Sequence, residues 1–184
     1  MPFTFHHFDI PDVVLVKSRL FPDDRGAFLE GYRHTTFAEH GITGPFVQDN
    51  VSISRQHVLR GLHYQKPPSA QAKLVLVIGG EIFDVAVDIR HGSPTFGQWV
   101  GETLSAGKMM YVPTGFAHGF LVTSAEATVL YKTTAEYAPE LERGIRWDDP
   151  ALAIRWPIPL PNLNARDAGL PTLANADNYF VYSP

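Results

Sequence analysis

Short runs of β-branched and aromatic residues recur along this chain, separated by glycine and proline, and this spacing limits the folds that the chain can adopt. The clearest example is residues 72–90, AKLVLVIGGEIFDVAVDIR. Two strand-like runs, 74–78 and 81–89, flank Gly79-Gly80, which predicts a β-hairpin. In the second run every second residue from Phe83 to Ile89 is apolar, which is typical of a strand with one apolar face.

Other segments have the same character, and only one short helix is predicted. Thr36 and Glu39 have the spacing of a capping box, and Gly41 is placed to end that helix. The further strands predicted from composition span residues 13–17, 26–32, 47–54, 58–64, 97–104, 108–112, 117–123 and 127–133. Many short strands with few helices predict an all-β sandwich or barrel, so we expect a jelly-roll-like barrel.

The length and composition fit one globular domain spanning residues 1–184. The net charge of −4 does not suggest a nucleic-acid-binding surface. No apolar run is long enough for a transmembrane helix, and the N-terminus lacks the pattern of a secretory signal. We therefore expect a soluble, cytoplasmic protein without nucleic-acid or membrane partners. From about residue 134 the chain becomes proline-rich and irregular, which predicts a tail wrapped on the barrel, where Glu142 and Asp167 could close a site.

The segment VLRGLHYQ, residues 58–65, places Arg60 and His63 within an apolar, strand-like run. His63 could be a hydrogen-bonded core histidine or a general base held by a carboxylate. Spacing alone does not identify the carboxylate, and Asp84, Asp88 and Asp167 all remain candidates. His118, in VPTGFAHGFLV, could cap a turn or supply a second polar group at the barrel mouth.

Three further positions each have a structural and a functional interpretation. Lys73 could be an edge lysine or could stabilise an oxyanion inside the barrel. Tyr131 could pack in the core or act as a general acid, with Lys132 beside it in the same strand. Arg25 and Glu30 could form a strand-end charge pair, or Arg25 could bind a phosphate.

The histidines do not have the spacing of a metal site. Metal-binding jelly rolls often carry two histidines two residues apart plus a carboxylate, and neither His63 nor His118 has such a neighbour. His6 and His7 lie near the N-terminus. The chain also has no cysteine, and it lacks the nucleophile-elbow, P-loop, dinucleotide and HExxH motifs. We therefore predict no metal.

Several sequence blocks occur in one order: FPDDRGAFLE, VQDNVSISRQHVLRGLHYQ, VPTGFAHGFLV and LYKTTAEYAPELERGIRWDDP. Over residues 5–172 the chain closely resembles the dTDP-4-dehydrorhamnose 3,5-epimerase family. The resemblance implies a cupin-type jelly roll, a homodimer that exchanges N-terminal strands, and no metal or organic cofactor. It implies a dTDP-sugar substrate with a keto group at carbon 4, whose neighbouring protons at carbons 3 and 5 are acidic enough to remove.

The resemblance also assigns catalytic roles to matching positions. His63 matches the base, and Asp167 in Asn164-Ala165-Arg166-Asp167 matches its partner. Arg166 replaces a lysine that is common in the family, which keeps the charge but not its geometry. Tyr131 matches the acid on the opposite face of the sugar, and Lys73 matches the residue that stabilises the enolate oxygen.

Substrate-binding roles follow from the same resemblance. Arg60 and His118 match residues near the sugar and diphosphate, and Tyr137 matches an aromatic residue near the base. Gly61 is then expected to leave room for the substrate. The full predicted binding set is Arg25, Glu30, Gln48, Asn50, Arg60, His118, Tyr137, Glu142 and Arg166, of which Arg25 and Glu30 would reach in from the partner subunit.

Two alternatives stay open. Related enzymes epimerise a single carbon of dTDP-4-keto-deoxysugars in other pathways. The second alternative is a non-catalytic cupin that binds nucleotide sugars. Such a protein would be expected to lack at least one of the four catalytic residues, which are His63, Lys73, Tyr131 and Asp167.

Overall fold

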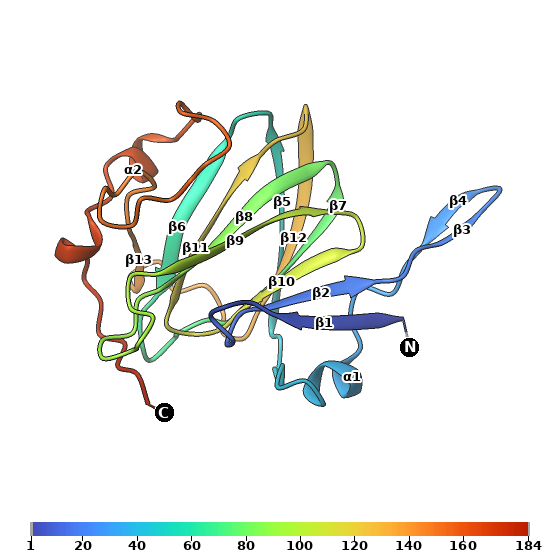
Figure 1. Ribbon diagram of the computed structural model, residues 1–184, viewed down its shortest axis with the longest axis horizontal. Helices are drawn as coiled ribbons and strands as arrows, with labels where there is room; N and C mark the ends of the chain where they lie inside the picture. The colour runs from blue at the N-terminus through green and yellow to red at the C-terminus, as the bar shows by residue number, and fades with distance from the viewer. Residues whose placement is uncertain (1, 184) are drawn as a thin grey trace.

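Two antiparallel β-sheets face each other in the computed structural model, which describes residues 2–183 (Figure 1). The first sheet contains, in spatial order, β1 (Phe3–His7), β2 (Val14–Ser18), β10 (Lys108–Val112), β7 (Lys73–Gly79), β12 (Glu126–Thr133) and β5 (Gln48–Arg55). The second contains β13 (Glu142–Gly144), β6 (Leu59–Gln65), β11 (Phe116–Val122), β8 (Glu81–Asp88) and β9 (Trp99–Ser105).

The strands from β5 to β12 pair in a nested order. β5 pairs with β12 and β7 with β10 in the first sheet, while β6 pairs with β11 and β8 with β9 in the second. Pairing of early strands with late strands across two sheets is the arrangement of a jelly roll. The all-β prediction is therefore confirmed.

The predicted Gly79-Gly80 hairpin is wrong. β7 and β8 lie in different sheets, so the glycine pair carries the chain across from one sheet to the other. Gly80 has a φ of +78°, and a Cβ there would lie 2.1 Å from the carbonyl oxygen of Glu126. The close approach and the left-handed backbone both require glycine at this position. A glycine pair is also typical of hairpin turns, so the sequence alone did not distinguish the two cases.

The alternation in β8 was predicted to give a strand with one apolar face. In the structure both faces of β8 are buried. Val85 and Val87 pack outward against the C-terminal segment, in a cluster with Leu62 and Leu152. The opposite face, which includes Ala86, points between the two sheets. The apolar face of β8 therefore binds the tail, and the face carrying the aspartates points toward the barrel interior.

Helices are few and short among the described residues. They are α1 (His34–Ala38), α2 (Ala165–Ala168) and the 3₁₀ turn η1 (Leu173–Asn175). The predicted capping box is wrong, because α1 begins before Thr36 and its N-cap residue, Arg33, makes no side-chain cap hydrogen bond. Packing holds α1 instead: Phe37 is fully buried against the rings of Phe3 and Phe5. Gly41 ends the turn as predicted, with a φ of +78°.

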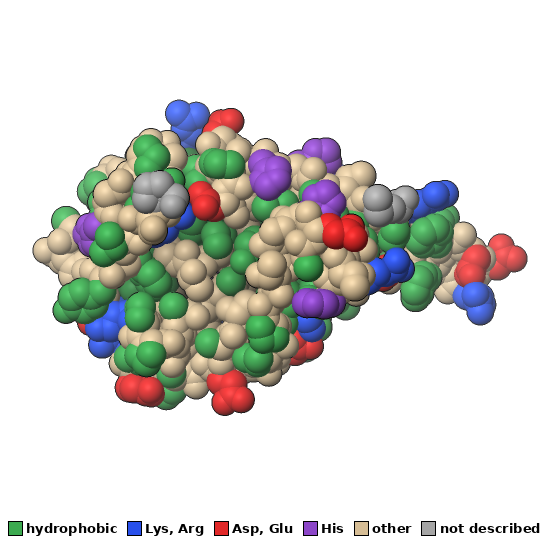
Figure 2. Space-filling model, turned by 90° about the horizontal axis from the view of Figure 1, so that it is seen from below, with side chains coloured by type: hydrophobic (Ala, Val, Ile, Leu, Met, Phe, Trp, Pro, Cys, Tyr) green, Lys and Arg blue, Asp and Glu red, His purple; other side chains and the backbone are tan. Residues whose placement is uncertain are grey.

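The hairpin of β3 (Phe21–Asp23) and β4 (Gly26–Phe28) projects from the body of the molecule (Figure 1). The predicted strand 26–32 therefore ends early, since β4 pairs only with β3. Figure 2 shows this arm extending from the body, with hydrophobic side chains along it and charged ones at its end. None of the described helices is long and apolar enough to cross a membrane.

Candidate active site

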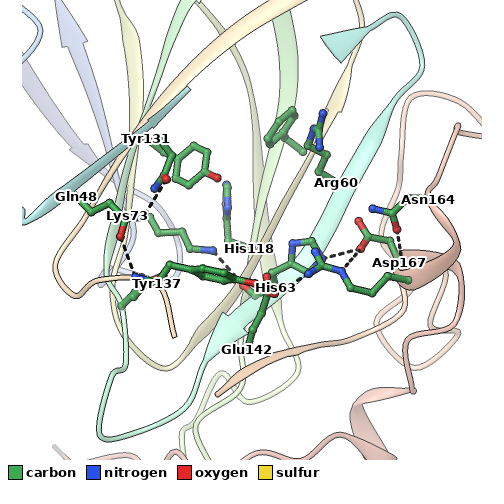
Figure 3. Close-up of a pocket in the computed structure, with 14 residues that line it drawn as sticks. Gln48, Arg60, His63, Lys73, His118, Tyr131, Tyr137, Glu142, Asn164 and Asp167 are labelled. Atoms are coloured by element: carbon green, nitrogen blue, oxygen red, sulfur yellow. Dashed lines mark hydrogen bonds and ion pairs between the residues drawn. The ribbon is translucent and has the colours of Figure 1, made fainter. Parts of the chain in front are cut away.

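A cavity of about 330 Å³ opens between the sheets and the C-terminal segment (Figure 3). Side chains from β5, β6, β7, β11 and β12 line it, and the tail adds others. The lining residues are Gln48, Asn50, Arg60, His63, Gln71, Lys73, His118, Phe120, Tyr131, Tyr137, Glu142, Asn164, Arg166 and Asp167.

An irregularity in β6 allows Arg60 and His63 to face the same cavity. In a regular strand, residues three apart point to opposite faces. Here the pairing of β6 with β11 shifts register: His118 pairs with His63, and Phe120 pairs with Arg60. Two residues of β6 thus oppose Gly119 alone, which is the count of a β-bulge. The bulge turns both polar side chains into the barrel.

Gly61 does not serve as room for the substrate, so that expectation is wrong. It lies against β11, where an added Cβ would be 2.5 Å from the Cα of Gly119. A Cβ on Gly119 would in turn be 2.7 Å from the carbonyl oxygen of Arg60. Gly61 also has a φ of +131°. The two glycines let β6 and β11 approach closely at the bulge. This close approach orients the side chains of Arg60 and His63 toward the cavity.

His63 is held by Asp167, as the resemblance predicted. Its Nε2 lies 2.9 Å from Oδ1 of Asp167, which is only 1% exposed. Asp167 Oδ2 accepts a hydrogen bond from the Gly61 backbone N–H at 3.2 Å. Within residues 2–183 no hydrogen bond reaches Nδ1 of His63, so this nitrogen is the one left to accept a proton.

The tail carries Asp167 to this position. Asn164 caps α2, since its Oδ1 accepts the Asp167 N–H at 2.7 Å. Before α2, the Leu59 N–H donates to the carbonyl of Asn162, and after it the Arg146 N–H donates to that of Pro171. These bonds fix both ends of the segment against the barrel. They bring together two residues more than a hundred positions apart.

Opposing effects act on the Asp167 carboxyl. Burial raises its pKa, but the hydrogen bond and charge of His63, the Gly61 N–H and the charge of Arg166 together hold the pKa below its ordinary value. Asp167 is therefore a carboxylate at neutral pH. A carboxylate there orients the imidazole and stabilises its protonated form.

Arg166, Glu142 and Tyr137 form a chain of contacts at the edge of the cavity. Nη1 of Arg166 donates to Oε2 of Glu142 at 2.6 Å, and the Tyr137 hydroxyl donates to the same oxygen at 2.8 Å. Nη2 of Arg166 lies 3.2 Å from Nε2 of His63. Because Nε2 of His63 carries the proton that Asp167 accepts, this last contact brings two donors together, so it is a close approach of the Arg166 charge and not a hydrogen bond.

His118 forms a second His–Asp pair. Its Nε2 lies 2.7 Å from Oδ1 of Asp84, which has no exposed surface. The other oxygen of Asp84, Oδ2, has no hydrogen-bond partner among the described residues. Of the three aspartates considered for His63, Asp84 instead holds His118, while Asp88 binds Arg90.

Lys73 and Tyr131 reach the cavity from the first sheet. Nζ of Lys73 donates to the carbonyl oxygen of His63 at 3.4 Å. Burial lowers the pKa of Lys73 to about 8, against the opposing charges of Glu142 and Asp84. Burial also raises the pKa of Tyr131; the charge of Arg60 lowers this pKa and the charge of Glu142 raises it. The phenol therefore keeps its proton at neutral pH. The site therefore has an acid and a cation facing the His–Asp pair from the other sheet.

Most predicted site residues meet in this one cavity, but Arg25 and Glu30 do not. Arg25 lies in the β3–β4 hairpin with its side chain 89% exposed and bound to Asp23. Glu30 is bound to Arg33. Their role at a partner's site stays a prediction.

Some lining residues were missed by the sequence analysis. Nothing in the sequence around Gln71 and Phe120 marked them as residues of a binding site. Asn164 had one, because an asparagine three residues before an aspartate is a helix N-cap pattern. Among the described residues, no group of three histidine, cysteine, aspartate or glutamate side chains could hold a metal ion.

Comparison with known proteins gives one consistent family. The family model of dTDP-4-dehydrorhamnose 3,5-epimerase matches residues 7–175. Among curated proteins, dTDP-4-dehydrorhamnose 3,5-epimerase of Pseudomonas aeruginosa is 55% identical over 172 residues, covering 91% of this chain and 94% of that protein. The enzyme of the same name from Salmonella typhimurium is 52% identical, covering 91% and 93%.

Solved structures agree with the sequence comparison. A crystal structure of dTDP-6-deoxy-D-glucose-3,5-epimerase from Legionella pneumophila, in complex with dTDP-4-keto-L-rhamnose, matches with a TM-score of 0.94. The two sequences are 44% identical, and the match covers 99% of this chain and 100% of that one. The predicted cupin-type fold is confirmed by this likeness.

Proposed function

The chain belongs to the dTDP-4-dehydrorhamnose 3,5-epimerase family, and on that basis we propose that it epimerises dTDP-4-keto-6-deoxy-D-glucose at carbons 3 and 5. The product is dTDP-4-keto-L-rhamnose, the sugar nucleotide in the complex of the Legionella relative. The protein acts as an isomerase in dTDP-rhamnose biosynthesis. The proposal includes a cytoplasmic location, where we expect this biosynthesis to occur.

One observation carries the proposal: a histidine paired with a buried carboxylate faces a protonated tyrosine across a single cavity. His63 comes from β6 in the second sheet, and Tyr131 comes from β12 in the first (Figure 3). A base and an acid on opposite walls can remove a proton from one face of a sugar and return one to the other. This arrangement therefore supports the inversion of a carbon without the sugar turning over in the site.

The reaction then follows from the acidity of protons next to a carbonyl. Nδ1 of His63 takes a proton from carbon 5, and the electrons of the C–H bond move toward the carbonyl to form an enolate. Lys73, as an ammonium, stabilises the negative oxygen. Tyr131 gives a proton to the opposite face of the carbon. The same cycle at carbon 3 completes the double epimerisation.

Other cavity residues are suited to holding the nucleotide. Arg60 offers a cation, and Gln48 and Asn50 offer amide groups on the inner face of β5. His118 is held by Asp84 on the same wall as His63, and Tyr137 presents an exposed ring for the base. These groups provide hydrogen bonds and charge for a sugar diphosphate.

We propose a homodimer in which the β3–β4 hairpin enters the partner's site. Phe28 on this hairpin is 69% exposed. The outer face of the first sheet also exposes Val51, Ile53 and Ile78. Large apolar side chains exposed together on one face of a sheet favour a protein–protein contact there. Arg25 lies at the end of the hairpin, away from its own cavity, where it could reach a neighbouring subunit.

The catalytic proposal is tested by replacing the base. The His63→Ala variant should keep its fold by circular dichroism and lose the exchange of substrate carbon-bound protons with deuterated solvent, measured by mass spectrometry. An exposed histidine, His6, replaced by alanine provides the matched control and should exchange at the normal rate. Normal exchange by His63→Ala would contradict the proposal.

The dimer is tested by mixing two inactive variants. Arg25→Ala keeps its own His63, while His63→Ala keeps its own Arg25. If the hairpin acts in the partner's site, mixed dimers contain one complete site, and mixing after mild dissociation restores activity. If Arg25 acts within its own subunit, or if the protein is a monomer by light scattering, mixing restores nothing.

A further inference from the structure

The substrate cavity is polar everywhere except at one side chain. Within residues 2–183, every side chain that lines it carries a nitrogen or oxygen atom, and the single exception is Phe120. The hydroxyls, carbonyl and phosphates of a nucleotide sugar all match the polar part of this lining. They do not account for a phenyl ring, so the ring calls for a ligand group of its own.

Packing holds the ring of Phe120 in place. The residue is only 4% exposed, and it belongs to the hydrophobic cluster between the two sheets, together with Ala86 and Val129. Side chains in such a cluster are close-packed, so the ring presents a fixed surface to the cavity. Its side chain has no hydrogen-bonding group to offer a ligand.

The pairing of β6 with β11 places this ring close to the base. His118 lies directly opposite His63, and Phe120, two residues further along β11, lies opposite Arg60. Alternate residues of a strand are about 7 Å apart, and the ring centroids of His118 and Phe120 are separated by 6.4 Å. A substituent on the carbon that His63 deprotonates can therefore reach the ring.

We propose that Phe120 binds the methyl group of the sugar and so makes the enzyme selective for 6-deoxy sugars. In the proposed substrate this methyl, carbon 6, is the only apolar substituent, and it is bonded to carbon 5. The inference rests on the proposed function, because that function places carbon 5 at His63. One apolar side chain in the cavity then meets the one apolar substituent of the sugar.

Selectivity follows from what a hydroxyl at carbon 6 would lose. Against the ring of Phe120 the hydroxyl would give up hydrogen bonds to water and gain none from the ring, which is unfavourable. A sugar without carbon 6 would instead leave the ring without its contact. An apolar pocket distinguishes one methyl or methylene group, or one added hydroxyl, by about 10–200-fold, so we expect a preference of at least about tenfold.

The test compares three nucleotide sugars that differ only at carbon 6. dTDP-6-deoxy-D-glucose carries a methyl group on carbon 5, dTDP-D-glucose carries a hydroxymethyl group, and dTDP-D-xylose carries only hydrogen. All three lack the keto group at carbon 4, so none is turned over, and titration calorimetry measures each Kd. The wild type should bind dTDP-6-deoxy-D-glucose about tenfold more tightly than either of the others.

Two matched variants assign the preference to Phe120. Phe120→Met and Phe120→Gln introduce unbranched side chains of similar size and shape, but only the glutamine offers hydrogen bonds to a hydroxyl. Phe120→Met should keep the preference for the methyl sugar. In Phe120→Gln the Kd values for the methyl and hydroxymethyl sugars should agree within about twofold. Circular dichroism and the binding of dTDP alone show that each variant is folded.

The outcomes separate this inference from the proposed function. If the wild type binds the three sugars equally, the inference is wrong, and this result does not depend on any variant folding. Equal preferences in Phe120→Met and Phe120→Gln would also overturn it, because another group would then select the methyl. Proton exchange at carbons 3 and 5 tests the proposed function separately. A wild type that binds none of the three sugars would contradict both.

Discussion

His63 and His118 lie directly opposite each other on β6 and β11, and each imidazole is held by a different buried aspartate. The Nε2 atoms lie 2.9 Å from Asp167 and 2.7 Å from Asp84, respectively. Asp167 comes from the tail and Asp84 from the neighbouring strand β8. The second sheet thus presents two oriented imidazoles to one cavity.

Asp167→Asn should abolish most of the activity without unfolding the protein. The amide keeps the shape of the side chain and can still accept from Gly61, but it no longer stabilises a protonated His63. We expect kcat to fall by about 10²–10⁴-fold, the usual contribution of general acid–base catalysis. Asp49→Asn, at an exposed position paired with Lys132, is the control and should be unaffected. If Asp167→Asn kept the wild-type kcat, the proposed role of Asp167 in stabilising the protonated form of His63 would be contradicted.

Asp84→Ala should reduce stability and weaken substrate binding. It leaves Nε2 of the buried His118 without a partner, which costs about 1–3 kcal/mol. KM should rise because His118 is no longer held against the cavity. Urea denaturation and steady-state kinetics measure the two effects. Equal stability of Asp84→Ala and the wild type would show that the second His–Asp pair contributes nothing to the fold.

The catalytic rate should decline as the pH rises above about 8, because the Lys73 ammonium then loses the proton that stabilises the enolate oxygen. Lys73→Met should be slow at every pH and should lack this decline. The measurement is the pH profile of deuterium exchange for both proteins. A wild-type rate that stays level from pH 7 to 10 would contradict the role of Lys73.

Burial of Lys73 also makes the free energy of unfolding depend on pH. The pKa of Lys73 is about 8 in the folded protein and 10.5 when unperturbed, so between these values the unfolded chain binds more protons. Stability from this group therefore rises as the pH increases from about 8 to 10.5. At pH 7, where the buried lysine is charged in both states, Lys73→Met should be more stable than the wild type. Urea unfolding of both proteins at pH 7 and 10 tests the sign.

Gly61→Ala should be much more destabilising than Gly26→Ala. Both glycines have nearly the same φ, +131° and +133°. A Cβ at Gly61 would lie 2.5 Å from the Cα of Gly119, whereas a Cβ at Gly26 meets nothing within 4 Å. A positive φ of this size costs a residue with a Cβ about 1–3 kcal/mol at either position, so the loss in Gly61→Ala beyond that in Gly26→Ala measures the contact with β11. Equal losses in thermal unfolding would contradict that contact.

The strands were predictable because their signal is local. The alternation in β8 and β12 and the turn residues between runs follow from side-chain direction. The assignment of strands to sheets was not predictable, since Gly79-Gly80 has the composition of a hairpin but crosses between sheets. The pairs His63–Asp167 and His118–Asp84 join distant segments, so spacing left three aspartates open for His63. Family motifs, rather than periodicity, singled out Asp167.

The central claim is that this chain inverts two carbons of one sugar. Proton NMR of the purified protein with dTDP-4-keto-6-deoxy-D-glucose in deuterated buffer tests it most directly. The account predicts deuterium at both carbon 3 and carbon 5, with conversion to dTDP-4-keto-L-rhamnose. Deuterium at a single carbon would identify a mono-epimerase with the same acid–base groups. No deuterium at either carbon, from a folded protein that binds the nucleotide sugar, would contradict the account.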